Sequence, residues 1–276
     1  MNNTTNNPVS AFEFECATSI SLYQADELWQ TISNQWLQIA FKHKYMYNFK
    51  WMGRPIIQTP IDMVAMQEII WEVKPDLIIE TGIAHGGSII MSASMLALLD
   101  MAEAIESGKK SVNPGQSKRK VLGIDIEIRP HNLVAIEAHP MFSRIRMIEG
   151  SSIAPDVIEQ VHSIVKDYKR ILVCLDSMHT HNHVLAELEA YAPLVTPGSY
   201  CVVFDTIIED MSADSFPDRP WGKGNNPKTA VREFLRQLEE EGRLAYDGCP
   251  LKFQINKAIE HKLLITVAPE GYLMRV

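Results

Sequence analysis

The sequence predicts an α/β fold, in which a mostly parallel β-sheet is covered by helices on both faces. Between residues 77 and 241, short apolar runs alternate with longer segments of helical periodicity. The runs are nearly continuous in Ile, Leu and Val, which is typical of strands buried on both faces. A glycine-rich turn follows the first run directly. The 276 residues, 46% of them hydrophobic, are enough to bury one large core.

The expected elements follow one another in a regular order. Strands are expected at residues 77–81, 121–125, 144–149, 171–176 and 200–205. Helices are expected at residues 87–99, 132–138, 155–168, 181–192 and 227–241. Near the C-terminus, residues 263–267 and 271–276 are extended with no helix between them. A strand there should pair antiparallel at the edge of the sheet.

The residues before this alternation predict a separate N-terminal part. Residues 1–10 are polar and predict a disordered tail, and residues 11–74 predict a helical extension before the α/β domain of residues 75–276. Within residues 25–43, five apolar side chains recur at helical spacing: Leu28, Trp29, Ile32, Trp36 and Ile39. This spacing predicts an amphipathic helix whose tryptophans pack into the core. Another helix is expected from residue 59 to about 73, since a cap and a proline open it.

Composition narrows the class of protein. The net charge of −8 argues against a general nucleic-acid binder, and the basic residues of 109–120 predict an exposed loop. The four cysteines show no CxxC spacing, so neither a disulfide framework nor a cysteine zinc site is expected: they are Cys16, Cys174, Cys201 and Cys249. We find no signal peptide and no apolar run that spans a bilayer. The sequence therefore predicts a cytoplasmic protein without a transmembrane segment.

The turn after the first strand, Glu80-Thr-Gly-Ile-Ala-His-Gly-Gly-Ser88, combines an acid with glycines. Its small side chains let backbone N–H groups approach a ligand closely, as in sites for NAD, nucleotides or S-adenosylmethionine. Glu80 would repel a pyrophosphate but suits a cation such as the amino group of an amino-acid moiety. The turn therefore favours S-adenosylmethionine over NAD.

Acids end the strands on both sides of this turn. Ligands of an open parallel sheet bind at the carboxyl ends of the strands, where an acid such as Asp125 can hold ribose hydroxyls. Asp176 and Asp205 end neighbouring strands, and two carboxylates there can bind a hard divalent ion such as Mg²⁺. That ion could bind a substrate hydroxyl and lower its pKa.

His179 lies three residues after Asp176 and could accept the proton of a substrate hydroxyl. It could equally be a polar residue at a helix start. The run His179-Thr-His-Asn-His183 could also suggest a histidine-ligated metal. We disfavour that interpretation, because only His179 and His183 would share a helix face and Asp176 is their one evident carboxylate partner.

A long loop follows the fifth strand, at residues 209–227, and is rich in Pro, Gly and Asn. Long loops at the ligand edge of a sheet are usually functional. Its Arg219, Trp221 and Lys223 suit a lid that stacks on a sugar or another ring. The alternative is a plain surface loop that ends in a helix cap.

Four motifs together resemble the cephalosporin hydroxylase / rhamnosyl O-methyltransferase family. They are Glu80-Thr-Gly-Ile-Ala-His-Gly-Gly-Ser88, Leu175-Asp-Ser-Met-His-Thr-His181, Ala192-Pro-Leu-Val-Thr-Pro-Gly-Ser199, and Phe204-Asp-Thr206 with the later Arg-Pro-Trp-Gly-Lys-Gly-Asn-Asn-Pro segment. The resemblance runs from about residue 45 to the end. It implies a Rossmann-like class I methyltransferase fold, with a seven-stranded sheet whose last strand is antiparallel. It also implies an S-adenosylmethionine site, often with Mg²⁺.

Carried over residue by residue, the resemblance implies a cofactor site lined by Glu80, Gly82, Gly86, Ser88, Asp125, Ser151 and Asp176. It implies that Asp176 and Asp205 hold the metal. Some relatives place Glu-Asp after the fifth strand, whereas this chain has Phe204-Asp205, so one candidate ligand is missing. Thr206, Glu209 or the substrate would then have to complete the metal's coordination.

These observations predict an S-adenosylmethionine-dependent O-methyltransferase, with Asp176, His179 and Asp205 as its catalytic residues. The acceptor is expected to be a hydroxyl of a sugar or of a related natural product or cell-surface glycan. The alternatives are a hydroxylase component of the same family and a noncatalytic cofactor-binding protein. A homo-oligomer is expected from the aromatic N-terminal region.

Overall fold

A seven-stranded sheet forms the centre of the molecule, and its inner strands are apolar on both faces. The computed structural model describes residues 7–276. The strand order is β5-β4-β3-β6-β7-β9-β8. Five strands are parallel: β3 (Leu77–Thr81), β4 (Lys120–Asp125), β5 (Ile145–Glu149), β6 (Ile171–Leu175) and β7 (Tyr200–Val203). The parallel sheet with two antiparallel strands at one end confirms the predicted fold class.

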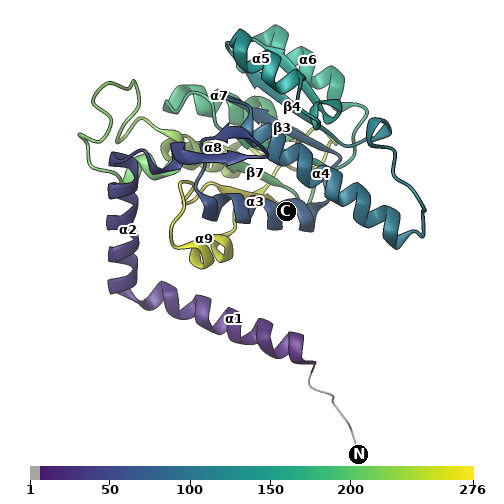
Figure 1. The fold of residues 1–276 in the computed structure, drawn as a ribbon. Coiled ribbons are helices and arrows are strands. Elements are labelled where there is room, and N and C mark those ends of the chain that lie inside the picture. The colour runs from purple at the N-terminus through teal and green to yellow at the C-terminus, as the bar shows by residue number, and fades with distance from the viewer. Residues whose placement is uncertain (1–6) are drawn as a thin grey trace, which may run out of the picture.

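Helices cover the two faces of this sheet (Figure 1). One face carries α3 (Pro60–Val73), α4 (Gly87–Glu106) and α5 (Pro130–Glu137), and the other carries α6 (Pro155–Val165), α7 (His181–Tyr191) and α8 (Pro227–Glu241). Alternate residues of β3 pack in the two apolar clusters, one on each face of the sheet. Ile78 packs in one apolar cluster, whereas Leu77 and Ile79 pack in the other. Both faces of the sheet are therefore core, which explains the continuous apolar runs in the sequence.

The strand order places a crevice between β3 and β6. From β3 the chain proceeds outward through β4 to β5, then returns to the other side of β3 with β6. Helices leaving neighbouring strands on opposite sides open a crevice at the carboxyl ends, where ligands of such sheets bind. The turn that begins at Gly82 and the residues after Leu175 meet at this point.

The C-terminal segment differs from the prediction. Residues 263–267 are not a strand, because Leu263 ends helix α9 (Lys257–Leu263) and Leu264 turns the chain with a φ of +57°. The antiparallel strand is β9 (Tyr272–Arg275), and it lies inside the sheet between β7 and the edge strand β8 (Phe253–Ile255). The sequence prediction missed β8, since this strand is only three residues long.

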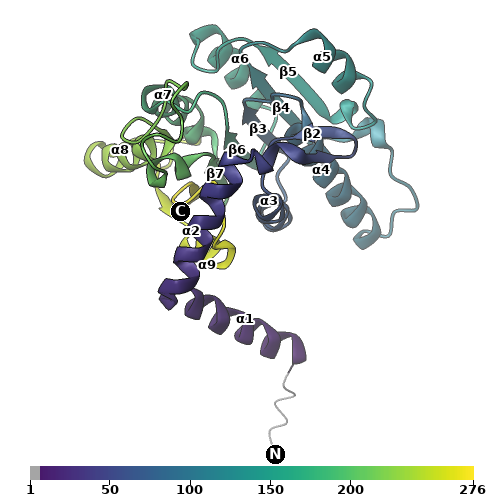
Figure 2. The same ribbon diagram turned by 60° about the vertical axis from the view of Figure 1, so that its left-hand side comes forward.

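The N-terminal region also differs in part. Helix α1 (Pro8–Ala25) begins inside the segment 1–10 that was predicted as a tail, and residues 1–6 lie outside the described part. Figures 1 and 2 show α1 projecting from the body, and none of its residues is buried. Helix α2 (Glu27–Lys42) buries only Ser33, Leu37 and Ala40. Its two tryptophans are 43% and 36% exposed, so the prediction that they pack into the core is wrong.

A short hairpin connects this region to the α/β domain. It follows a 3₁₀ turn at Tyr45–Asn48 and consists of β1 (Phe49–Trp51) and β2 (Arg54–Ile56). From the sequence, residues 45–58 are expected to form an irregular aromatic segment that packs beside the cofactor cleft or forms a subunit contact. The hairpin packs beside α4 through the Trp51 indole N–H, which donates to Ser94 Oγ at 2.9 Å.

Three further expectations concern burial. Cys174 and Cys201 lie inside apolar runs that were expected to be strands, and both are buried in strands. Arg119 was expected in an exposed basic loop but is 7% exposed, because its guanidinium pairs with Asp100 at 2.5 Å and with Glu103. Among the described residues, one helix, Gly87–Glu106, is long and apolar enough to cross a bilayer, and half of that stretch is buried inside the fold.

Candidate active site

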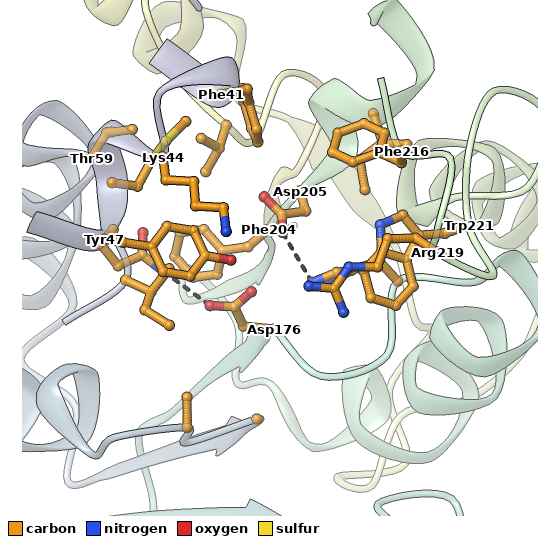
Figure 3. A pocket seen from close by; sticks show the side chains of 18 of the residues that line it. Phe41, Lys44, Tyr47, Thr59, Asp176, Phe204, Asp205, Phe216, Arg219 and Trp221 are labelled. Carbon is orange, nitrogen blue, oxygen red and sulfur yellow. Dashed lines mark hydrogen bonds and ion pairs between the residues drawn. The ribbon is translucent and has the colours of Figure 1, made fainter. Parts of the chain in front are cut away.

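A large cavity opens at the carboxyl ends of β3, β6 and β7. It encloses about 1380 Å³. Its floor is formed by the turn after β3 and by the residues that follow β6 and β7. Its outer wall comes from the end of α2 and from the loop that precedes α8 (Figure 3). The site therefore combines the sheet edge with two segments that lie far from it in the sequence.

Glycine is required in the turn after β3 because other chain segments press against it. Gly82 has a φ of +81°, and a Cβ there would lie 2.0 Å from the carbonyl oxygen of Asp176. A Cβ on Gly87 would lie 2.2 Å from the carbonyl oxygen of Pro55. Both residues line the cavity. The backbone of this turn thus faces a ligand without side chains in between.

Asp125 anchors the same turn from the end of β4. Its Oδ2 accepts hydrogen bonds from the backbone N–H of Ile83 at 2.9 Å and of Ala84 at 3.1 Å. Asp125 itself is not among the residues that line the cavity, whereas the following Ile126 is. The predicted contact of Asp125 with ribose hydroxyls remains a prediction, and the structure adds a role in holding the turn.

Glu80 lies one layer below the cavity surface. Its side chain is 4% exposed and accepts a hydrogen bond from the Ser88 hydroxyl, which lines the cavity. Burial raises the pKa of Glu80 to about 7, and the Ser88 hydrogen bond opposes this rise. The carboxyl would reach a ligand through Ser88 or after a side-chain rearrangement. Two other residues predicted for the cofactor site, Gly86 and Ser151, also stay outside the cavity wall.

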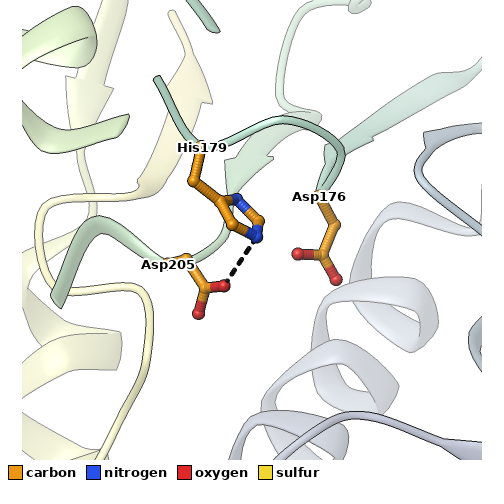
Figure 4. Close-up of side chains that lie close together, drawn as sticks. All are labelled: Asp176, His179 and Asp205. Carbon is orange, nitrogen blue, oxygen red and sulfur yellow. Dashed lines mark ion pairs between the residues drawn. The ribbon is translucent and has the colours of Figure 1, made fainter. Parts of the chain in front are cut away.

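Asp176, His179 and Asp205 all line the cavity, and their side chains lie close together (Figure 4). One ligand atom from each lies within 4.8 Å of the others. His179 Nε2 is 3.0 Å from Asp205 Oδ2. The turn after β7 aims Asp205 inward from a left-handed backbone conformation with a φ of +56°. The structure thus brings together all three residues that the sequence predicts as catalytic.

Burial and neighbouring negative charges perturb the Asp176 carboxyl. Burial, and then the nearby carboxylates of Asp205, Glu80 and Glu187, raise the pKa of Asp176 well above its usual range. The Gln58 amide opposes this by donating to Asp176 Oδ2 at 3.1 Å. A bound cation would relieve the same repulsion, so the donor set of two carboxylates and one imidazole fits a divalent metal ion.

Several further residues line the cavity, although the sequence prediction named none of them individually as a site residue. Gln58 is 6% exposed and comes from the segment between β2 and α3. Figure 3 shows Lys44 and Tyr47, from the end of the N-terminal extension, pointing into the cavity towards Asp176. No motif marks these positions, because their role depends on how the N-terminal extension folds back over the sheet edge.

The loop before α8 supplies the opposite wall. The Trp221 ring lies 4.8 Å from the His179 ring in an edge-on arrangement, and the Arg219 guanidinium lies 5.2 Å from the centre of the Trp221 ring. Both line the cavity, whereas Lys223 is exposed and does not. Glu209 fixes the loop by accepting the backbone N–H of Gly224 at 2.7 Å. Two of the three predicted lid residues are therefore in place.

A buried acid braces the loops behind the cavity, and the sequence prediction missed it. Glu187 of α7 is fully buried, and its Oε1 accepts hydrogen bonds from Ser152 and Ser177 at 2.6 Å each. Ser152 follows β5 and Ser177 follows Asp176. Glu187 therefore ties together the loops after two strands, at the back of the site.

The doubly wound sheet, with its glycine turn and acids at the carboxyl edge, is the Rossmann-like fold of class I methyltransferases. A model of the family Rhamnosyl O-methyltransferase/CmcI matches residues 43–276, and the chain belongs to this family. It is 31% identical over 241 residues to the rhamnosyl O-methyltransferase of Mycobacterium leprae, which covers 84% of this chain and 88% of the relative. The Mycobacterium tuberculosis protein of the same name is 28% identical over 243 residues, covering 84% and 83%.

The solved structures that match this chain do so at low sequence identity. CalS11, a TDP-rhamnose 3'-O-methyltransferase of calicheamicin biosynthesis, is 20% identical with a TM-score of 0.43, covering 80% of this chain and 88% of its own. An O-methyltransferase from Bacillus cereus in complex with SAH is 15% identical with a TM-score of 0.44, covering 76% and 80%.

Proposed function

We propose that this protein is an S-adenosylmethionine-dependent O-methyltransferase that acts on a hydroxyl of a sugar or of a sugar-bearing natural product. The observation that carries the proposal is the convergence of Asp176, His179 and Asp205 beside a glycine turn open to the cavity. Membership of the rhamnosyl O-methyltransferase family supports the reaction and the kind of acceptor.

The two halves of the cavity would divide the reactants between them. S-adenosylmethionine would lie across the glycine turn, with its methyl group directed towards the three polar residues. The acceptor oxygen attacks the methyl carbon, the carbon–sulfur bond breaks, and the hydroxyl proton passes to this polar cluster. Catalysis here depends on holding oxygen and methyl in line and removing the proton. A divalent ion held by Asp176 and Asp205 would lower the pKa of the acceptor hydroxyl.

The size and lining of the cavity support two reactants. About 1380 Å³ exceeds the range of roughly 300–1000 Å³ that is usual for one small-molecule site. Aromatic side chains from the N-terminal extension and from the loop before α8, Tyr47 and Trp221 among them, surround the outer half. Such rings suit the apolar faces of a sugar.

The test is methyl transfer by wild-type protein and by Asp176→Asn, with Asp156→Asn as control. Asp156 is exposed in the first turn of α6, away from the cavity. Candidate acceptors are TDP-rhamnose and simple rhamnosides, read out by S-adenosylhomocysteine release and a mass gain of one methyl. We expect Asp176→Asn to lower turnover by at least about 1000-fold while the control stays active.

Three outcomes would contradict the proposal. Unchanged turnover in Asp176→Asn would remove the residue from the reaction. Binding of S-adenosylmethionine without transfer to any acceptor would favour a noncatalytic protein. Oxygen consumption with a reductant, in place of methyl transfer, would favour a hydroxylase component.

We also propose that the protein is a homo-oligomer that pairs through α2. Four exposed apolar residues of this helix follow the alternating three- and four-residue spacing of a coiled-coil seam: Trp29, Ile32, Trp36 and Ile39. Two acids, Asp26 at the N-cap and Glu27, lie at the start of the helix, and Lys42 ends it. An antiparallel pair of copies would therefore bury the seam and place opposite charges side by side.

Light scattering after size-exclusion chromatography tests this arrangement. We expect Ile32→Glu to shift the protein to a monomer. The control Ile105→Glu changes an apolar residue that is 71% exposed on another helix and should leave the mass unchanged. A monomeric wild type, or an Ile32→Glu variant of unchanged mass, would refute pairing through α2.

The net charge of −8 and the four unpaired cysteines support our further proposals of a cytoplasmic setting and no nucleic-acid partner.

A further inference from the structure

We propose that His179 is a metal ligand, and that the site of Asp176, His179 and Asp205 prefers a first-row transition ion such as Mn²⁺ or Co²⁺ to Mg²⁺. This inference deepens the proposed function, because it concerns the metal of the same site. It assigns His179 to the metal in place of the proton-acceptor role that the sequence also allows, so the hydroxyl proton would pass to a carboxylate oxygen of the same cluster. Its basis is the position of one imidazole nitrogen among two carboxylates.

The distances among the three donors suit one ion. A metal with ligands at about 2.1 Å places adjacent donor atoms about 3 Å apart and opposite ones about 4 Å apart. His179 Nε2 and Asp205 Oδ2 are separated by 3.0 Å, which matches an adjacent pair. The limit of 4.8 Å for all three atoms requires only small side-chain movements for Asp176 to join them.

The charges around the site also call for a cation. Within residues 7–276, neither Asp176 nor Asp205 forms an ion pair with a lysine or an arginine. Asp176 is held only by the amide of Gln58, whose own Oε1 is buried without a hydrogen-bond partner. The two carboxylates together carry the charge that balances a divalent ion.

The residue before Asp205 explains why the imidazole matters. Phe204 is 4% exposed and packs in the apolar core, so the residue next to Asp205 offers no further ligand. Mg²⁺ takes oxygen ligands and demands near-ideal octahedral geometry. An imidazole nitrogen suits transition ions better than Mg²⁺. The imidazole donor of His179 should therefore shift the preference of the site from Mg²⁺ to these ions.

The surroundings of the ring support a fixed ligand. The edge-on Trp221 ring, 4.8 Å away, packs against the His179 imidazole. The ring is held between this indole and the Asp205 carboxylate, and Figure 4 shows Nε2 directed towards the space between the two aspartates. A metal ligand whose orientation is set by its neighbours binds with less loss of conformational freedom.

Calorimetry on full-length protein, stripped with a chelator, measures the preference directly. Mn²⁺, Co²⁺ and Mg²⁺ are titrated with S-adenosylhomocysteine present. We expect Mn²⁺ and Co²⁺ to bind at least about tenfold more tightly than Mg²⁺. The visible absorption of bound Co²⁺ should change in His179→Gln, since it reports ligand type independently of activity.

Two variants and a control sharpen the result. His179→Asp restores an all-oxygen donor set and should bring Mg²⁺ affinity to within a few-fold of Mn²⁺. The control His181→Gln changes a residue of the same segment whose Nδ1 contacts Thr229 instead, and it should behave as wild type. Circular dichroism and melting temperature confirm that each variant is folded.

The outcomes separate this inference from the proposed function. Equal or tighter Mg²⁺ binding by the wild type, unchanged Co²⁺ spectra in His179→Gln, or no metal binding at all would each overturn the inference. Methyl transfer would still stand in those cases, because it is measured separately. Failure of S-adenosylhomocysteine itself to bind would instead contradict the proposed function.

Discussion

The two walls of the cavity are built in different ways. The sheet wall consists of the turn after β3 and the residues after β6, where Gly82 presses against the backbone of Asp176 and Asp125 holds the turn. The outer wall consists of the end of α2 and the loop before α8, whose residues are mostly exposed. The sheet wall is held in place and carries the groups that the reaction requires. The outer wall is exposed, so its residues can differ between proteins that bind different acceptors.

The largest predicted difference between the two walls is in stability and cofactor affinity, and it is tested by replacing two glycines that have the same backbone conformation. Gly82 and Gly224 both have a φ of +81°, but a Cβ meets the Asp176 carbonyl at the first and nothing within 4 Å at the second. We expect Gly82→Ala to lower the free energy of unfolding by about 2–4 kcal/mol, from strain plus overpacking. It should also weaken S-adenosylhomocysteine binding by about 100-fold or more.

In the matched variant Gly224→Ala, the added Cβ causes backbone strain but overlaps no neighbouring atom. It should lose only about 1 kcal/mol and keep cofactor affinity, since its site lies in the outer wall. Urea unfolding and calorimetry measure both quantities. Equal losses in the two variants would show that the sheet wall is no more constrained than the loop.

The sequence predicts the sheet wall of the cavity well, because local sequence patterns mark its residues. The sheet wall was predicted because each of its residues directly follows an apolar run: Glu80, Asp176 and Asp205 mark the ends of strands that are recognised by composition. The parallel order then brings those ends together. This part of the site depends on neighbours in the sequence.

The outer wall depends on long-range packing, and so the sequence predicts it only in part. Gln58 donates a hydrogen bond to Asp176, and Lys44 points towards Asp176; both lie more than a hundred positions earlier in the chain, and no local pattern marks them. The same limit explains the wrong prediction for the α2 tryptophans. Helical spacing shows that a helix has an apolar face, but not whether that face meets the core or another molecule.

The second effect concerns Glu80, the buried acid of the sheet wall. Its pKa is about 7 in the folded protein and near 4.5 in the unfolded chain, so the folded state binds more protons between these values. Stability from this group is therefore complete below about pH 4.5 and is lost as the pH rises through 7. The loss amounts to up to about 3 kcal/mol, at 1.36 kcal/mol for each pH unit.

Glu80→Gln removes this titration. We expect the variant to gain stability relative to the wild type between pH 5 and pH 8, measured by urea unfolding without ligand. Ser88→Ala sharpens the test, because the Ser88 hydrogen bond lowers the pKa of Glu80. Without that bond, the loss of stability should extend to higher pH. A difference between wild type and Glu80→Gln that does not vary with pH would mean that Glu80 is already ionised in the folded protein.

The smallest effect tests the outer wall through Trp221. This ring packs against His179 and carries the Arg219 guanidinium over its face, but it makes none of the contacts that hold the glycine turn. We expect Trp221→Ala to raise the acceptor KM about tenfold, which corresponds to the loss of about 1.4 kcal/mol of ring contact, and to leave cofactor affinity unchanged. Lys223→Ala, two positions along the same loop and outside the cavity, is the control and should match the wild type. Steady-state kinetics and calorimetry separate the two constants. If S-adenosylhomocysteine affinity falls as far as KM rises, the loop belongs to the cofactor half, and the division of the cavity into a fixed and a variable wall fails.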